Sequence, residues 1–337
     1  MQIGIIGLPQ SGKTEVFKLV TGEAPSVSGT LQKSVVQIPD TRLDHLSEML
    51  DSKKKTSATA EFVDARARDE KDKSTSETVT ALRDSDLLLA VVRGFATPGM
   101  ETHAENDYTD ILTDLTVIDL DIVLKRLEKL EKPVKKNMQD QVDKEKALLE
   151  KAREALESEK QLSDVDFDAG SMKILRSFQF LTLTPLVFIF NTDENNPDIP
   201  ATLPEGTLRV FASLENELME MDPDERSEFM EDMGIAEFSR NKIITACLHA
   251  LDMISFYTAG EKESKAYLVP RNTNIVTAAG KIHSDIEKGF IRAEVFNYEK
   301  FVAAGSYKQA KANGDMLLVS KDYEVQDGDM LDIRFNV

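Results

Sequence analysis

The sequence predicts an α/β protein whose larger part is a doubly wound, mainly parallel sheet. Three observations support this prediction. Short apolar runs alternate with helical periodicity up to about residue 256, and a glycine-rich turn separates the first run from the first helix. Beyond residue 256, short strands surround one helical segment, which predicts a separate small α+β domain.

The elements of the sheet domain follow in order along the chain. Residues 2–6 form an apolar strand pattern, and residues 15–20 continue as a helix after the turn. Residues 21–34 have the small polar composition of a loop. Short apolar runs predict further strands at residues 35–38, 59–65, 87–92, 184–191 and 209–213.

A helical insertion interrupts this sheet domain. From residue 119 to about 161, apolar residues recur every three or four positions among many Lys and Glu residues, which predicts long amphipathic helices. Pro133 is expected to interrupt or kink the first helix. Strand pattern resumes at residue 184, so the helices form an inserted hairpin. The predicted domains are the sheet domain at residues 1–118 and 168–256, the hairpin at 119–167 and the terminal domain at 257–337.

Composition restricts the classes of partner. The 337 residues include 60 acidic and 41 basic side chains, and the net charge of −19 argues against broad adhesion to nucleic acid or anionic lipid. Any RNA contact must therefore be local. The single cysteine, Cys247, excludes an internal disulfide framework and a multi-cysteine metal site. Neither residues 1–9 nor residues 180–190 fit a signal peptide or a membrane span, so we expect a cytoplasmic protein without membrane contact.

The turn after the first strand matches a phosphate-binding motif. Residues 7–14, GLPQSGKT, satisfy G-x-x-x-x-G-K-T and lie between a predicted strand and a predicted helix. Glycine lets the backbone curl so that successive N–H groups point inward, and the helix N-terminus favours a phosphate. We expect Lys13 to reach the β and γ phosphates and the Thr14 hydroxyl to bind Mg²⁺.

Two later segments complete the predicted site. Asp64 ends an apolar strand at the position where such proteins place the carboxylate of the Mg²⁺ shell. Residues 191–194, NTDE, follow a buried strand, where a GTPase would carry N-K-x-D. An aspartate there accepts hydrogen bonds from the N1–H and the exocyclic N2–H of guanine. Because Glu194 is longer and no lysine backs the ring, the segment favours adenine over guanine.

These residues together resemble the YchF subfamily of Obg-type P-loop NTPases, which prefer ATP to GTP. The resemblance extends over nearly the whole chain. It implies a G domain, an inserted coiled-coil hairpin that offers a surface to a protein partner, and a terminal TGS domain of β-grasp type. It also implies association with the ribosome or RNA through the TGS and G domains. The motifs that support it are GLPQSGKT, PDTRLDHL at 39–46, EFVD, NTDE, FASLENEL at 211–218, the run from FYTAGEKESK to FIRAEV, and DYEVQDGDMLDIRFNV at the end.

The resemblance also implies which residues bind the nucleotide and the metal. The phosphate-binding residues are Gly7, Gln10, Ser11, Gly12, Lys13, Thr14 and Glu15. The base-binding residues are Asn191, Thr192, through its backbone, Glu194 and Ala212. The metal-associated residues are Thr14, Asp64 and a second hydroxyl, either Ser28 or Thr30.

The chain departs from the family in both switch segments. The family follows its acid with DIAGL and a glycine-rich loop, but here Asp64 leads into DARARDEKDKSTSE, with Ala67 in the glycine position. The family's PFCT segment corresponds to SVSG, at 26–29. No glutamine follows Asp64 at the spacing that orients water, and His103 is isolated, so no catalytic residue is assigned. Slow turnover is expected.

Three functions remain in competition. The leading hypothesis is an ATP-binding protein with slow Mg²⁺-dependent hydrolysis that acts as a switch on a ribosome or RNA partner. The second is a nucleotide-binding platform without useful hydrolysis, and the third is a GTPase. A basic group on the terminal domain is either a local RNA or ribosome contact or an ordinary charged helix face, and consists of Lys281, His283, Lys288 and Arg292.

Overall fold

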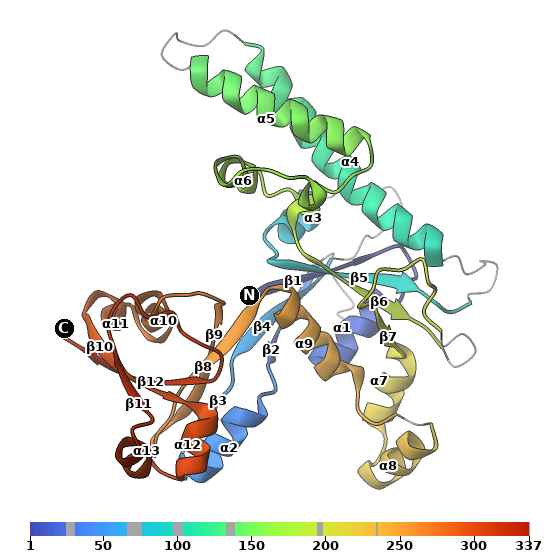
Figure 1. The fold of residues 1–337 in the computed structure, drawn as a ribbon. Coiled ribbons are helices and arrows are strands. Elements are labelled where there is room, and N and C mark those ends of the chain that lie inside the picture. The colour runs from blue at the N-terminus through green and yellow to red at the C-terminus, as the bar shows by residue number, and fades with distance from the viewer. Residues whose placement is uncertain are drawn as a thin grey trace. The chain divides into compact units, whose positions relative to one another are not determined.

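The computed structural model describes residues 1–24, 31–65, 76–96, 104–132, 139–193, 198–233 and 235–336, without the side chains of 65, 76 and 77. These residues form two compact units (Figure 1). The first unit comprises Met1–Val35 and Glu61–Cys247, and the second comprises Val36–Ala60 and Leu248–Val337. None of the described helices is long and apolar enough to cross a membrane.

The first unit is built on a six-stranded sheet with the order β2-β4-β1-β5-β6-β7. The pairs β4–β1, β1–β5, β5–β6 and β6–β7 are parallel, and every residue of β5 is buried. The chain extends from β1 toward both edges, so the carboxyl end of β1 is the switch point where such sheets bind ligands. The strands are β1 Gln2–Gly7, β2 Leu31–Gln37, β4 Thr59–Ala65, β5 Leu87–Arg93, β6 Leu186–Asn191 and β7 Leu208–Val210.

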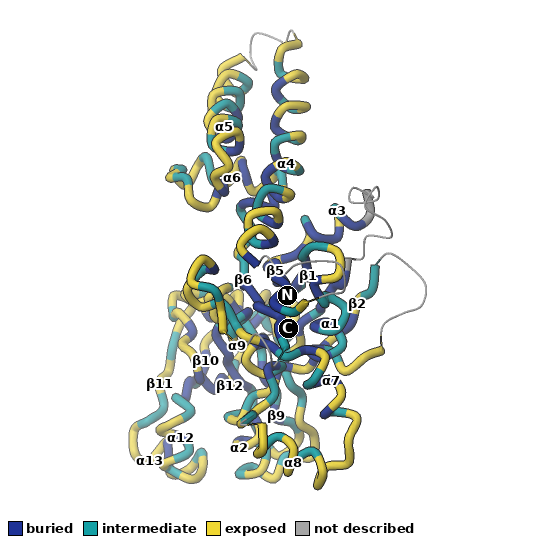
Figure 2. Tube along the Cα trace, turned by 90° about the vertical axis from the view of Figure 1, so that its right-hand side faces the viewer, coloured by how far each residue is buried: buried dark blue, intermediate teal, exposed yellow. Residues whose placement is uncertain are grey.

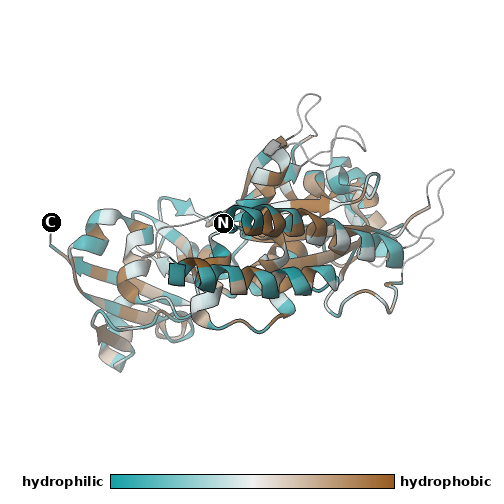
Figure 3. Cartoon of the chain, turned by 90° about the horizontal axis from the view of Figure 1, so that it is seen from above, coloured by the Kyte–Doolittle hydropathy of each residue, from teal (hydrophilic) through white to brown (hydrophobic). Residues whose placement is uncertain are grey.

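Helices follow most strands of this unit, as the alternating pattern predicts. The carboxyl-terminal part of α4 pairs with α5 around a cluster that includes Val123, Leu127, Leu149 and Leu156. Their outer faces are exposed and hydrophilic residues alternate with hydrophobic ones along both (Figures 2 and 3). The helices are α1 Lys13–Thr21, α3 Ser76–Arg83, α4 Ala104–Leu130, α5 Gln139–Glu157, α6 Ala169–Arg176, α7 Ala212–Glu220, α8 Pro223–Asp232 and α9 Ser239–Ala250, with 3₁₀ turns at Leu162–Asp164 and Leu181–Leu183.

The first helix of the hairpin begins earlier than the periodicity from residue 119 suggests. Helix α4 starts at Ala104, and its first turns place Ile111 and Leu115 in the same cluster as the sheet residues Leu88 and Phe190. The helix is therefore an extension of the sheet core as well as half of a hairpin. Pro133, expected to interrupt it, lies outside the described residues.

The second unit contains a mixed six-stranded sheet with the order β11-β10-β12-β8-β9-β3. Strands β8–β9, β10–β12 and β10–β11 pair antiparallel, whereas β12–β8 and β3–β9 pair parallel. Its strands are β3 Lys55–Thr56, β8 Met253–Thr258, β9 Ser264–Pro270, β10 Phe290–Asn297, β11 Met316–Val319 and β12 Asp329–Phe335. Its helices are α2 Thr41–Met49, α10 Ile275–Ile282, α11 Ser284–Lys288, α12 Tyr298–Ala304 and α13 Tyr307–Asn313. The predicted fold class, a parallel sheet with a helical hairpin and a terminal α+β part, is confirmed.

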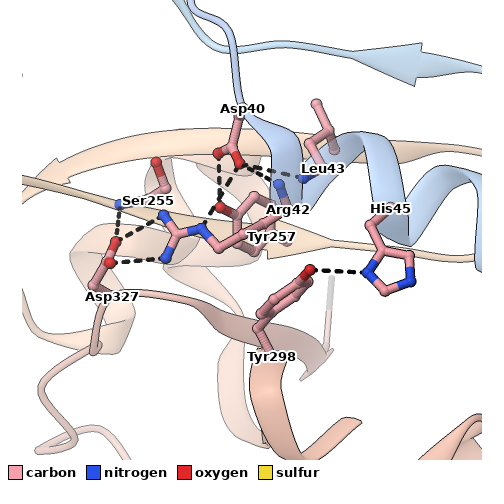
Figure 4. A network of polar contacts seen from close by, with 8 residues as sticks. All are labelled: Asp40, Arg42, Leu43, His45, Ser255, Tyr257, Tyr298 and Asp327. Carbon is pink, nitrogen blue, oxygen red and sulfur yellow. Dashed lines mark hydrogen bonds and ion pairs between the residues drawn. The ribbon is translucent and has the colours of Figure 1, made fainter. Parts of the chain in front are cut away.

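The grouping of the chain into compact units differs from the predicted boundaries in two segments. Residues 36–60 and 248–256, which the sequence predicts as part of the sheet domain, group with the carboxyl-terminal residues. The reason is burial: Leu43 and Leu46 of α2 are fully buried in one cluster with Tyr257 and Phe301, and β3 pairs with β9. Polar contacts between α2 and the strands of this unit add to the packing (Figure 4).

Candidate nucleotide-binding site

The turn between β1 and α1 has a backbone that only glycine accommodates at two positions. Gly7 and Gly12 have φ angles of 149° and 85°. A Cβ atom at Gly7 would lie 2.5 Å from the Val91 carbonyl oxygen, and one at Gly12 would lie 2.1 Å from Asn191 Nδ2. Both the backbone angle and the available space therefore require the two motif glycines.

Lys13 lies against the loop that precedes it. Its Nζ donates hydrogen bonds to the carbonyl oxygens of Gly7, at 2.9 Å, and Leu8, at 2.6 Å. Helix α1 starts at Lys13 with Gly12 as its N-cap, and glycine has no side chain with which to cap that end. A lysine and a helix N-terminus at one turn form a region of positive potential, which suits a phosphate group.

The two predicted metal-associated residues lie together. Asp64 is fully buried at the end of β4, in register with Ile5 of β1. The Thr14 hydroxyl donates to Asp64 Oδ2 across 3.5 Å. A hydroxyl and a carboxylate oxygen are hard donors of the type that Mg²⁺ prefers. Within the described residues no group of three or more His, Cys, Asp or Glu could hold a metal by itself. This donor pair therefore fits a Mg²⁺ ion that phosphate oxygens also bind.

Asn191 links the loop to the far side of the site. Its Nδ2 donates to the Ser11 carbonyl oxygen at 3.1 Å, and its Oδ1 accepts from the Ala212 N–H at 3.2 Å. The side chain is buried at the end of β6. Its amide nitrogen and oxygen each hold a protein partner and brace the loop between β1 and α1 against the start of α7. The contact of Asn191 with a base stays a prediction.

The other predicted base residues are divided between described and undescribed segments. Thr192 donates its N–H to the Val210 carbonyl oxygen at 2.9 Å and its hydroxyl to the Gly94 carbonyl oxygen at 3.1 Å. It therefore extends the sheet. Ala212 is buried beside Asn191. Several predicted positions lie outside the described residues, namely Glu194, Ser28, Thr30, Ala67 and His103.

One contact at the site was not predicted. Asn216 of α7 is buried, and its Nδ2 donates to the backbone oxygen of Glu15 at 3.0 Å and to Glu15 Oε2 at 2.8 Å. The quoted motif FASLENEL contains Asn216, but a helix pattern alone does not say which distant side chain it meets. The arrangement fixes the direction of the Glu15 carboxylate.

The predicted basic group of the second unit is exposed. Lys281, His283, Lys288 and Arg292 all lie at the surface. His283 ends α10, and its Nδ1 accepts the Asp285 N–H at 3.1 Å as the N-cap of α11. One of the four thus has a local structural role, and the contact of this group with RNA stays a prediction.

Comparison with known proteins places the chain in a family. Residues 253–336 match the family model YchF-GTPase_C, described as a protein of unknown function (DUF933). "Ribosome-binding ATPase YchF" of Escherichia coli O157:H7 is 33% identical over 359 residues, and its counterpart in Bacillus subtilis (strain 168) is 31% identical over 363, each match covering 99% of both chains.

A solved structure shares the fold. The chain matches the structure of the Schizosaccharomyces pombe YchF GTPase with a TM-score of 0.85 and 22% identity, over 99% of this chain and 97% of that one. At this identity the likeness speaks for the fold alone. With relatives above 30% identity over their full length, the chain belongs to the YchF family.

Proposed function

We propose that this chain binds ATP with Mg²⁺ at the carboxyl end of β1 and hydrolyses it slowly, as a nucleotide-controlled switch on the ribosome. The observation that supports this most directly is the loop between β1 and α1, with Lys13 on its carbonyl oxygens and Thr14 beside the buried Asp64. The relatives' name, ribosome-binding ATPase, supports both the nucleotide and the partner. A ribosomal partner implies a cytosolic location.

Each residue of the loop has a role in holding the phosphates. Lys13 exchanges its two carbonyl partners for phosphate oxygens, and Gly7 and Gly12 allow the backbone to approach them closely. Thr14 and Asp64 would hold the Mg²⁺, which neutralises charge on the β and γ oxygens. Asn191 keeps Ser11 in place, so the loop stays in the geometry that the phosphates require.

Adenine preference follows from the base segment. The amide of Asn191 is bonded to Ser11 and Ala212, so it braces the loop. Glu194 is too long to place its oxygens where an aspartate meets guanine N1 and N2, and no lysine precedes it to cover the ring. We infer that these differences penalise guanine more than adenine.

Isothermal titration with non-hydrolysable analogues of ATP and GTP, with and without Mg²⁺, tests the binding. ATP analogue is expected to bind at least about tenfold more tightly than GTP analogue, a difference of about 1.4 kcal/mol. Mg²⁺ should tighten binding to the wild type but much less to Asp64→Asn, which keeps the shape and removes the charge. Tighter binding of the guanine analogue would overturn the adenine assignment.

Slow hydrolysis is proposed from the segment after Asp64. The loop and Lys13 stabilise ground state and transition state alike, and such uniform binding does not raise kcat. Loss of one preorganised donor costs about 3 kcal/mol, or about a hundredfold in rate. In single-turnover assays we expect slower phosphate release than from a relative that has the intact glycine-rich switch, and only partial recovery in Ala67→Gly. Equal rates would show that the switch glycine is dispensable.

The second candidate, a nucleotide-binding platform, is favoured by the same altered segment. It predicts ATP binding without release of phosphate above the background of Lys13→Ala.

Co-sedimentation with purified ribosomes in the presence of ATP analogue or ADP tests the partner. The ATP-bound form should sediment more, and Lys288→Glu should reduce this because Lys288 belongs to the exposed basic group. Equal sedimentation in both nucleotides would remove the switch.

A further inference from the structure

Glu15 occupies a helix position that ordinarily closes the N-terminus. Helix α1 begins at Lys13 after the N-cap Gly12, so Glu15 is its third residue. A glutamate at this position typically turns back and accepts a hydrogen bond from the N–H of the N-cap residue. In this chain that N–H belongs to the loop proposed to surround the phosphates. A Glu15 carboxylate in the ordinary position would compete with phosphate for the donor and add negative charge beside it.

The structure directs this carboxylate elsewhere. Asn216 of α7 donates from Nδ2 to Glu15 Oε2 at 2.8 Å and to the Glu15 backbone oxygen at 3.0 Å. The backbone oxygen and Oε2 of Glu15 are both hydrogen-bond acceptors, so the Asn216 side chain must direct its NH₂ group toward them. Gly12, the N-cap, has no side chain of its own with which to cap the helix.

The orientation of the Asn216 side chain leaves one of its polar atoms buried without a hydrogen bond, which costs stability. It is 2% exposed, and its Oδ1 is buried without a hydrogen-bond partner among the described residues. An apolar side chain would fill the same space without leaving a buried acceptor unsatisfied. The contact between α1 and α7 also has a second link, since Lys18 Nζ lies 2.7 Å from Glu220 Oε1. Packing of the two helices alone therefore does not explain the asparagine.

We infer that Asn216 is a positioning residue for nucleotide binding. It holds the Glu15 carboxylate against α7 and so keeps the N-terminus of α1 open to phosphate. This inference rests on the proposed nucleotide site and deepens it by explaining how an acidic residue is tolerated next to the phosphates. Asn216 itself does not touch the nucleotide, and its effect passes through Glu15.

The test measures the Kd of a Mg²⁺-bound non-hydrolysable ATP analogue for the wild type, Asn216→Ala, Glu15→Gln and the double variant. Asn216→Ala should bind about tenfold more weakly, the range that corresponds to one capping interaction. The double variant should regain the affinity of Glu15→Gln within about twofold, because the uncharged side chain no longer repels phosphate. A structural role for Asn216 predicts the opposite, no rescue.

Two further variants keep the outcome clear. Asn216→Asp preserves the volume, replaces the donor with a second carboxylate and should weaken binding as well, with rescue by Glu15→Gln. Glu220→Gln breaks the other link between α1 and α7 and should leave the affinity unchanged within about twofold.

The possible failures are distinguishable. A wild type that binds no nucleotide overturns the proposed function and this inference together. A wild type that binds, with Asn216→Ala and Asn216→Asp equal to it, overturns the inference alone. An Asn216→Ala defect that persists at full size in the double variant also overturns it. Protection of the buried Cys247 thiol reports that each variant is folded.

Discussion

The loop between β1 and α1 in the first unit and the Asp40–Arg42–Asp327 cluster in the second differ in the partners that their cations have. In the loop, the Lys13 ammonium donates to two carbonyl oxygens, partners that phosphate oxygens can replace. In the cluster, Arg42 meets both oxygens of Asp327, at 2.8 and 3.2 Å, and Asp327 also accepts the Ser255 N–H at 2.9 Å (Figure 4). A matched, bidentate ion pair stabilises the fold, whereas a cation on replaceable carbonyl groups is suited to a ligand.

The rest of the cluster is equally occupied. Asp40 accepts the N–H groups of Arg42 and Leu43 as the N-cap of α2, and its Oδ2 accepts the Tyr257 hydroxyl at 2.7 Å. Burial, together with the negative charge of Asp40, raises the pKa of Tyr257 above its ordinary value, so the phenol stays a donor. These contacts join α2 to strand β8. The motifs GLPQSGKT and PDTRLDHL both belong to the family resemblance, but the polar residues of the first suit a ligand and those of the second stabilise the fold.

The largest expected effect is on nucleotide binding by the loop between β1 and α1. Lys13→Ala should weaken ATP-analogue binding by at least about a hundredfold, because it removes a charge that phosphate requires. The midpoint of denaturation should change little, since the lysine packs no core. Lys125→Ala, an exposed lysine paired with Asp121 four positions before it, is the control. A folded Lys13→Ala protein with wild-type affinity would contradict the assignment of the site.

The two glycines that flank α1 allow the effect of steric crowding to be distinguished from the effect of a positive φ angle. Gly12 and Gly22 both have positive φ, 85° and 74°, but a Cβ meets Asn191 only at Gly12 and nothing within 4 Å at Gly22. Gly12→Ala should lower the free energy of unfolding by about 2–3 kcal/mol and weaken binding at least tenfold. Gly22→Ala should cost about 1 kcal/mol and leave affinity unchanged. Similar affinities for the two variants would show that the Asn191 brace is dispensable.

In the Asp40–Arg42–Asp327 cluster, Arg42→Ala should destabilise the second unit and leave the nucleotide affinity unchanged. Loss of the charged hydrogen bonds to a half-exposed Asp327 is expected to cost about 1–2 kcal/mol. Arg271→Ala removes a more exposed pair with Asp252 and should lower the stability less than Arg42→Ala does. Chemical denaturation gives both values, and titration with ATP analogue gives the affinity. A nucleotide affinity reduced more than threefold in Arg42→Ala would mean that the cluster also shapes the site.

The smallest effect is a pH dependence of the cluster. Burial opposes ionisation of Asp327, but the hydrogen bonds from Arg42 and the Ser255 N–H outweigh it, so its folded pKa lies below its ordinary value. Its contribution to stability is therefore complete above the unfolded pKa of about 3.9 and is lost as pH falls through the lower folded value. Asp327→Asn should be less stable than wild type at pH 6, and the difference should narrow below about pH 4. A constant difference over that range would exclude this linkage.

Cys247 supplies a probe for these experiments. Burial raises the pKa of this thiol to about 12, and it is the one cysteine of the chain. A thiol reagent at pH 8 should therefore not label it in the folded protein, and labelling should report unfolding of the first unit. Arg42→Ala, whose changes lie in the second unit, should leave Cys247 protected.

The strand, glycine turn and helix around residues 7–14 could be predicted because the requirements of this turn are local. Eight consecutive residues contain the glycines, the lysine and the hydroxyl, and the neighbouring strand and helix follow from apolar periodicity. The family and fold class were predicted for the same reason and are confirmed. The proximity of Thr14 and Asp64 was also predictable, since the carboxyl ends of parallel strands meet at one edge.

The contacts that organise these pieces could not be predicted in this way. The apolar face of α2 indicates burial but not against which sheet, and its partners Tyr257 and Phe301 lie more than 200 positions along the chain. The sequence motif does not say that the amide of Asn191 links Ser11 to Ala212. Its choice of partners depends on where three separate segments meet.

The sequence by itself determined a glycine-rich loop with a phosphate-binding motif on an α/β sheet, an acidic chain with a helical hairpin, and membership of the family. These properties depend on the order and periodicity of neighbouring residues. Only the tertiary structure decided that α2 packs in the second unit, that Asn191 braces the loop and that Asn216 donates a hydrogen bond to the Glu15 carboxylate. Hydrogen bonds and apolar contacts act over a few ångströms, so their partners are set by the folded path of the chain.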